Sequence, residues 1–132
     1  SLRVSVGDHS TSTAVILPAK TASGGVIVNS TIGFQDSYDY YKFTISSNRG
    51  VDIYLSGMNR DADLELLNSS GRVIGRSDFG GTTPDRIRLN LSAGTYYIRV
   101  KPYSATAHLV SNYTLRYTNA VSGGYATQIG RV

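Results

Sequence analysis

The sequence contains no cysteine and no tryptophan, and it has one methionine and two histidines. Without cysteine the chain has no disulfide, no thiolate nucleophile and no thiolate metal ligand, so its stability must come from a hydrophobic core or a bound ion. No segment has a long apolar stripe with the period of a helix, and no apolar run is long enough to cross a membrane. These absences exclude a helical bundle, a membrane-spanning helix and a cysteine-dependent enzyme.

Glycine and tyrosine are abundant instead, with 14 and 10 copies in 132 residues. Short segments alternate apolar and polar residues with a period of two, and turn-forming residues separate them. The clearest of these segments are 41–45, 51–55, 87–91, 96–100 and 113–117. This alternation is typical of antiparallel strands that bury one side. We therefore predict an all-β fold, an antiparallel two-sheet β-sandwich of jelly-roll-like form with eight or nine strands.

The length fits one domain, because a chain of this size can bury about two-thirds of the surface that it exposes when unfolded. We place a single sandwich at residues 1–118, within which 1–25 is loosely patterned, and a tail or linker at 119–132. No signal peptide is recognisable, and the chain begins with Ser1 rather than Met. We expect a processed chain or a piece of a longer one.

A hairpin turn is predicted at Asn68-Ser69-Ser70-Gly71, between the apolar pairs 66–67 and 73–74. Glycine at the fourth position can adopt the positive φ that such a turn requires. The segment therefore predicts two adjacent antiparallel strands.

Five short motifs occur in series along the chain. They are Asp-Tyr-Tyr-x-Phe at 39–43, Asp-Ala-Asp-Leu at 61–64, Asn-Ser-Ser-Gly at 68–71, Ala-Gly-Thr-Tyr-Tyr-Ile-Arg-Val at 93–100 and Asn-Tyr-Thr-Leu at 112–115. In this order and spacing the chain resembles the bacterial pre-peptidase C-terminal domain over residues 8–118. That β-sandwich module is appended to secreted peptidases and is related to the collagen-binding domain of clostridial collagenases. The resemblance implies a monomeric, non-catalytic accessory module of a secreted or cell-surface bacterial protein.

Asp36 and Asp39 lie three residues apart at the entrance of a predicted strand, where a turn can aim both carboxylates at one point. Carboxylate oxygens suit Ca²⁺, which takes about six to eight oxygen ligands. Calcium-binding relatives resemble this arrangement and add a hydroxyl from the preceding strand and an N-terminal acid. The resemblance thus implies a ligand set of Asp8, Ser30 or Thr31, Asp36 and Asp39.

The chain departs from those relatives at Val4 and Val6, where they carry glutamates, and this predicts weaker calcium binding. The alternative is that Asp36 caps a turn, that Asp39 accepts hydrogen bonds from nearby backbone N–H groups, and that no ion binds.

The whole chain has a net charge of +4, and its basic residues concentrate in the C-terminal part. The alternation predicts a set of outward-facing side chains, namely Arg86, Arg88, Tyr97, Arg99, Lys101, Tyr103 and Arg116. If their strands are neighbours in one sheet, they form a basic face with tyrosines in it. Arginine and tyrosine recur at binding hot spots, so such a face suits an extracellular protein, a polysaccharide or an anionic surface polymer.

The collagen-binding relatives use tyrosines on the equivalent strand. Tyr103 resembles one of them, but Lys101 stands where another would be. The alternative is that the outward cations keep an exposed sheet soluble.

Nucleic acid and catalysis are both disfavoured. The charge excess is modest and no nucleic-acid-binding motif is present. His9 and His108 lie in separate polar loops, and no nucleophile, zinc or phosphate-loop motif occurs. We predict no enzyme, with a small hydrolase as the least favoured reading. The expected role is attachment to a substrate or surface polymer, or support of a neighbouring catalytic domain; the alternative is a structural spacer without a ligand.

Overall fold

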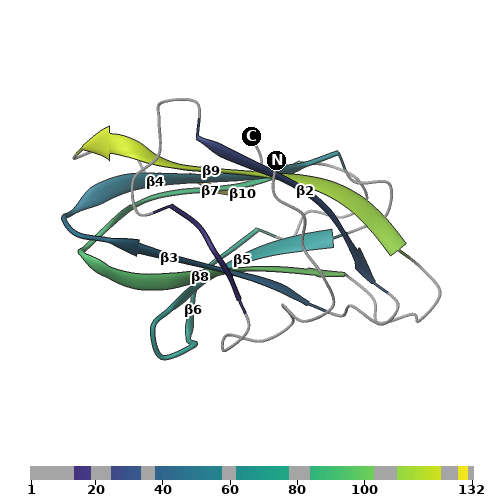
Figure 1. Ribbon diagram of the computed structural model, residues 1–132, viewed down its shortest axis with the longest axis horizontal. Helices are drawn as coiled ribbons and strands as arrows, with labels where there is room; N and C mark the ends of the chain where they lie inside the picture. The colour runs from purple at the N-terminus through teal and green to yellow at the C-terminus, as the bar shows by residue number, and fades with distance from the viewer. Residues whose placement is uncertain are drawn as a thin grey trace.

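The computed structural model describes residues 14–18, 25–33, 38–57, 62–77, 84–102, 110–122 and 128–130 (Figure 1). Ten strands lie within these ranges. They are β1 (Val15–Ile16), β2 (Val26–Gly33), β3 (Asp39–Ile45), β4 (Arg49–Ser56), β5 (Ala62–Asn68), β6 (Val73–Ser77), β7 (Asp85–Leu91), β8 (Gly94–Pro102), β9 (Val110–Ser122) and β10 (Gln128–Gly130). No helix in the described part is long and apolar enough to cross a membrane.

The strands form two facing sheets of five, which appear as two layers in Figure 1. Sheet A has the order β10-β7-β4-β9-β2, and sheet B has the order β1-β3-β8-β5-β6. All described pairings are antiparallel except that of β1 with β3. The predicted antiparallel two-sheet β-sandwich is therefore confirmed. The described strands exceed the predicted eight or nine because β1 and β10 are too short to show a period of two.

The core lies between the sheets and follows the predicted alternation. Tyr41 and Phe43 on β3, Ile53 on β4, and Ile98 on β8 are all buried. On β9 the residues Tyr113, Leu115 and Tyr117 are buried in the same core. Inward-facing positions could be assigned from the sequence because burial of alternate residues is imposed by strand geometry.

The predicted hairpin turn is present between β5 and β6. Gly71 has φ 86° and donates its N–H to the carbonyl of Asn68 at 2.9 Å. The side-chain Oδ1 of Asn68 accepts hydrogen bonds from the backbone N–H groups of Ser70 and Arg72, both at 3.0 Å. Asn68 therefore replaces the backbone partners that the chain loses where it reverses.

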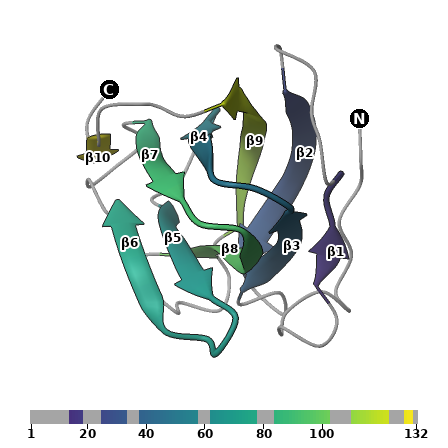
Figure 2. The ribbon, with the colours of Figure 1, turned by 90° about the vertical axis from the view of Figure 1, so that its left-hand side faces the viewer.

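The C-terminal part differs from the predicted tail. β9 continues to Ser122, and β10 pairs antiparallel with β7 at the edge of sheet A (Figure 2). Residues 119–122 and 128–130 thus belong to the sandwich, and the prediction of a loose tail is wrong for them. The glycines at 123 and 124 hid this pairing, because they interrupt the pattern just after β9.

Candidate functional site

Asp39 is the first residue of β3, and its side chain is fully buried at the core side of sheet B. Tyr113 of sheet A donates its O–H to Oδ2 of Asp39 at 2.5 Å. The hydroxyl oxygens of Tyr113 and Tyr41 are also 2.5 Å apart. A chain of hydrogen bonds therefore links the two sheets through the core.

Burial raises the pKa of Tyr113 far above its ordinary value of 10.0, and the neighbouring Tyr41 and Asp39 raise it further. Tyr113 thus keeps its proton wherever the domain is folded. It acts as a fixed hydrogen-bond donor to Asp39.

The other predicted metal ligands can be placed only in part. Ser30 on β2 is half-buried and lies across from Tyr113 in sheet A, on the same inner side as Val28. Thr31 lies across from Asn112, and its side chain is outside the described part, as are Asp8 and Asp36. Within the described residues, no three His, Cys, Asp or Glu side chains gather closely enough to hold a metal ion.

The predicted outward basic residues lie on two faces instead of one. Arg86 and Arg88 on β7 and Arg116 on β9 belong to sheet A. Tyr97, Arg99 and Lys101 on β8 belong to sheet B, and Tyr103 lies outside the described residues. The condition for a single basic face is therefore not met, because β8 pairs with β3 and β5 while β7 and β9 both pair with β4.

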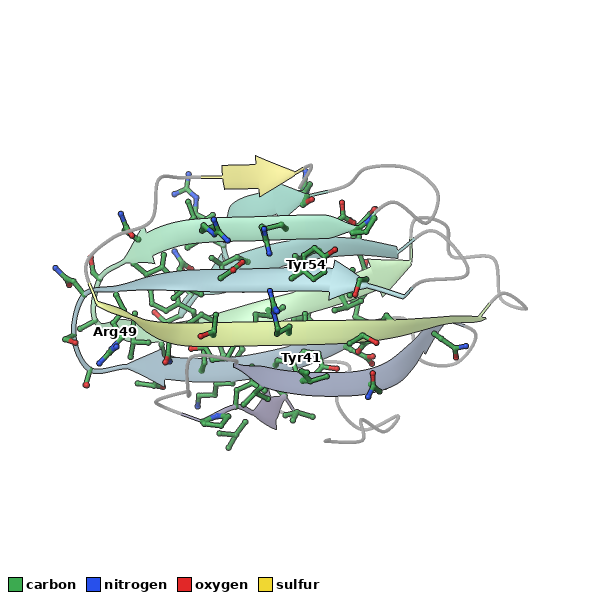
Figure 3. All side chains as sticks on the ribbon, turned by 90° about the horizontal axis from the view of Figure 1, so that it is seen from above. Tyr41, Arg49 and Tyr54 are labelled. Atoms are coloured by element: carbon green, nitrogen blue, oxygen red, sulfur yellow. The ribbon has the colours of Figure 1, made fainter. Side chains whose placement is uncertain are left out.

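On the outer face of sheet A, Tyr54 lies between two arginines across neighbouring strands. The guanidinium carbons of Arg86 and Arg116 are 4.8 and 5.7 Å from the centroid of the Tyr54 ring. Asp52, nearly buried, forms ion pairs of 3.2 Å with Arg86 and with Arg88. Figure 3 looks onto this face and labels Tyr54, which lies toward the C-terminal end of β4.

On the outer face of sheet B, three cations converge on Glu65 of β5, whose side chain is fully buried. The Nε of Arg76 is 2.8 Å from Glu65 Oε2, and the Nζ of Lys101 is 3.5 Å from the same oxygen. Arg99 bonds the other oxygen, Oε1, through Nε at 2.6 Å. A single carboxylate thus holds side chains from β6 and β8.

Two tyrosines complete this cluster on sheet B. Arg99 donates a hydrogen bond to the hydroxyl of Tyr40 at 3.0 Å. Its guanidinium carbon is 5.2 Å from the centroid of the Tyr38 ring and 5.7 Å from that of Tyr40. Cation–π contacts of this kind fix the arginine in addition to its ion pair.

The protonation of the cluster follows from these contacts. Burial by itself would raise the pKa of Glu65, but hydrogen bonds from Arg99 and Arg76 and the charge of Lys101 outweigh it, so the pKa lies below its ordinary value. Burial would likewise lower the pKa of Arg99, yet its bonds to Tyr40 and Glu65 raise it. Glu65 is therefore a carboxylate and Arg99 a cation at neutral pH.

Sequence reasoning missed the residues that organise both faces, namely Tyr38, Tyr40, Asp52, Tyr54, Glu65 and Arg76. The alternation did place Asp52 and Tyr54 opposite to the core side of β4. Their partners could not be found from the sequence, because they come from strands 32 or more positions away in the chain and depend on the strand order.

The fold and its two charged outer faces define a small β-sandwich module. The model of the family described as the bacterial pre-peptidase C-terminal domain matches residues 37–102, which is half of the chain. The chain therefore belongs to the bacterial pre-peptidase C-terminal domain family, and the sequence resemblance is confirmed. Membership supports a non-catalytic accessory domain, and the matched residues include the whole cation cluster around Glu65.

Solved structures share the fold at low sequence identity. The pre-peptidase C-terminal domain of collagenase from Bacillus anthracis is 18% identical with a TM-score of 0.65, and the match covers 80% of this chain and 94% of that one. A periplasmic inhibitor of g-type lysozyme from Aeromonas hydrophila is also 18% identical, with a TM-score of 0.51 and coverage of 80% and 96%. A comparison with curated protein sequences finds no match.

Proposed function

We propose that this domain is a non-catalytic attachment module of a secreted or cell-surface bacterial protein. In this proposal the outer face of sheet B holds an extracellular polymer, protein or polysaccharide, near a neighbouring catalytic domain. Family membership supports the accessory role. The proposed ligand-binding residues are Tyr38, Arg76, Tyr97, Arg99 and Lys101.

The observation that carries the proposal is the organisation of cations by Glu65. A buried carboxylate fixes Arg76, Arg99 and Lys101, which are 52%, 19% and 28% exposed. Their positions are thus set before a ligand arrives, which lowers the entropy cost of binding. Tyr38, 38% exposed, adds a rigid aromatic surface beside them.

Cosedimentation with insoluble polymers, such as fibrillar collagen, cellulose and bacterial cell walls, tests the proposal. The variant Tyr38→Ala/Lys101→Ala changes sheet B, and Tyr54→Ala/Arg116→Ala makes the matched change on sheet A. We expect the first pair to abolish binding and the second to leave it intact, with circular dichroism confirming that both variants are folded. Equal binding by both variants would reject the sheet B face. Binding of no polymer by the parent domain would favour a structural spacer.

We further propose that calcium stabilises the module. The donors that fit a hard cation are the carboxylate of Asp39 and the hydroxyl of Ser30, which both lie near Tyr113 at one end of the core. Asp36 and Asp8 are the further ligands in this proposal. When bound, the ion would supply structural cross-linking of the segments that carry these residues.

Thermal unfolding in excess EDTA and in millimolar Ca²⁺ tests the calcium proposal. Binding to the folded state raises the midpoint by mass action. We expect a rise for the parent domain and none for Asp36→Ala/Asp39→Ala. Tyr113→Phe is the control, because it keeps every proposed ligand and removes only the hydroxyl that bonds Asp39 and Tyr41. An equal midpoint in EDTA and in calcium would refute the proposal.

A further inference from the structure

Two cationic nitrogens on the outer face of sheet B share one oxygen atom. Both the Nε of Arg76 and the Nζ of Lys101 lie within 3.5 Å of Oε2 of Glu65. The ammonium group of lysine carries three N–H donors and the guanidinium group of arginine five, so a single carboxylate oxygen cannot engage them all. Because both side chains also reach solvent, a second anion can bridge them from outside.

The charge of the whole outer face agrees with this local geometry. Among the described side chains, its cations are Lys42, Arg76, Arg99 and Lys101, and its carboxylates are Asp63 and Glu65. Both carboxylates are buried, while the cations remain partly exposed. A ligand approaching from solvent therefore meets a net positive surface whose negative charges are covered.

We propose that the sheet B face binds an acidic glycan, with a carboxylate or sulfate group seated between Arg76 and Lys101 above Glu65. This inference rests on the proposed function and names its ligand class. Arg99, held by Glu65 and Tyr40, lies beside the seat. Glu65 is a positioning residue that keeps the cations together and does not touch the ligand.

The arrangement of apolar side chains favours a glycan over a folded protein. Protein interfaces have an apolar centre that is depleted of charge, surrounded by a polar rim. The sheet B face is the reverse, since its centre is the cation cluster and its exposed aliphatic side chains, Ile16 on β1 and Ile74 on β6, lie on the two edge strands. A charged centre with an exposed tyrosine suits a ligand that is itself polar, anionic and extended.

Isothermal titration calorimetry of the whole 132-residue chain tests the inference. The probes are oligogalacturonate, which carries carboxylates, a heparin-derived oligosaccharide, which carries sulfates, neutral cello-oligosaccharide, and poly-L-glutamate as an acidic peptide. The variant Arg76→Gln/Lys101→Gln removes the seat. The matched control Arg88→Gln/Arg116→Gln removes two charges from sheet A. Affinities are measured at low and at physiological salt, because salt screens exposed charges.

We expect one or both acidic glycans to bind, and the one that binds best identifies the anion. The affinity of the sheet B variant should fall about tenfold or more, which is the effect expected from losing one charge-assisted hydrogen bond. The affinity of the sheet A control should change little. Equal losses in the two variants would overturn the inference, because they indicate a non-specific charge effect. So would equally tight binding of poly-L-glutamate or of the neutral glycan. Tight binding of the neutral glycan overturns only the acidic character of the ligand. The proposed function itself is refuted if the domain binds none of these probes and none of the polymers in the cosedimentation test.

Discussion

The two outer faces of the sandwich carry the same net charge but organise it differently. Among the described side chains, sheet A presents three arginines and one aspartate, and sheet B presents four cations and two carboxylates. On sheet A the excess charge is spread over separate contacts, with Arg116 against Tyr54 and two arginines on Asp52. On sheet B three cations meet at one buried carboxylate. Net charge alone therefore does not identify a binding face; the arrangement of the cations around the acid does.

This difference has an energetic basis. Cations that converge on one point repel each other, so the group persists only because Glu65 offsets the repulsion in a water-poor position. The arrangement of the three cations on sheet B therefore depends on one residue, Glu65. The contacts on sheet A are divided between two centres, Asp52 with Arg86 and Arg88, and the Tyr54 ring with Arg86 and Arg116.

The largest effect is expected for Glu65→Gln. This variant leaves Arg76, Arg99 and Lys101 around an uncharged amide, and we expect a loss of about 2–4 kcal/mol in the free energy of unfolding, somewhat less than for a fully buried pair because the cations reach water. Urea denaturation with an unchanged m value measures this loss. A loss below about 1 kcal/mol would show that the cluster behaves as an ordinary surface ion pair.

Asp52→Asn is the matched variant on sheet A, and its effect should be smaller. Arg86 and Arg88 keep their other surroundings, so we expect a loss of about 1–2 kcal/mol, the usual cost of weakening hydrogen bonds to a charged group. The same urea titration measures it. If the loss equalled that of Glu65→Gln, the two faces would depend equally on their central carboxylates.

The pH dependence of stability separates the charge of Glu65 from its shape. Because its pKa is lower in the folded state than the ordinary 4.5, its contribution is fully present above about pH 4.5 and is lost as the pH falls through the folded-state pKa. The stability difference between the parent and Glu65→Gln should therefore shrink as the pH falls below about 4.5. Unfolding titrations from neutral to acidic pH provide the measurement. A constant difference would mean that the carboxylate charge contributes nothing.

The smallest effect concerns the contact of Tyr54 with Arg116. A double-mutant cycle with Tyr54→Leu and Arg116→Gln should give a coupling energy of about 0.5–1 kcal/mol, the usual size of an exposed cation–π contact. Chemical denaturation of the four proteins supplies the cycle. Coupling indistinguishable from zero would show that the ring and the guanidinium are merely neighbours.

The sequence correctly predicted the side of a strand on which a residue lies. It did not predict features that depend on which strands pair with each other. Tyr41, Ile53 and Leu115 were assigned to the core correctly, because alternation decides the side of a strand on which a residue lies. The sheet to which a strand belongs depends on pairing, so the sequence left open whether Arg86 and Arg99 share a face, and they lie on two different faces. The pattern also could not reveal that an outward-facing residue such as Glu65 is buried, since its cover comes from β6 and β8.

The position of β9 has a consequence for how the chain folds. This strand pairs with β4 on one side and with β2 on the other, so sheet A cannot be completed until residues 110–122 are available. The contact between β2 and β9 spans more than 75 positions of the sequence, and such distant pairings slow folding. During synthesis the apolar side of the strands would thus stay exposed until β9 has been made. Until then the nascent chain would depend on chaperones to prevent aggregation.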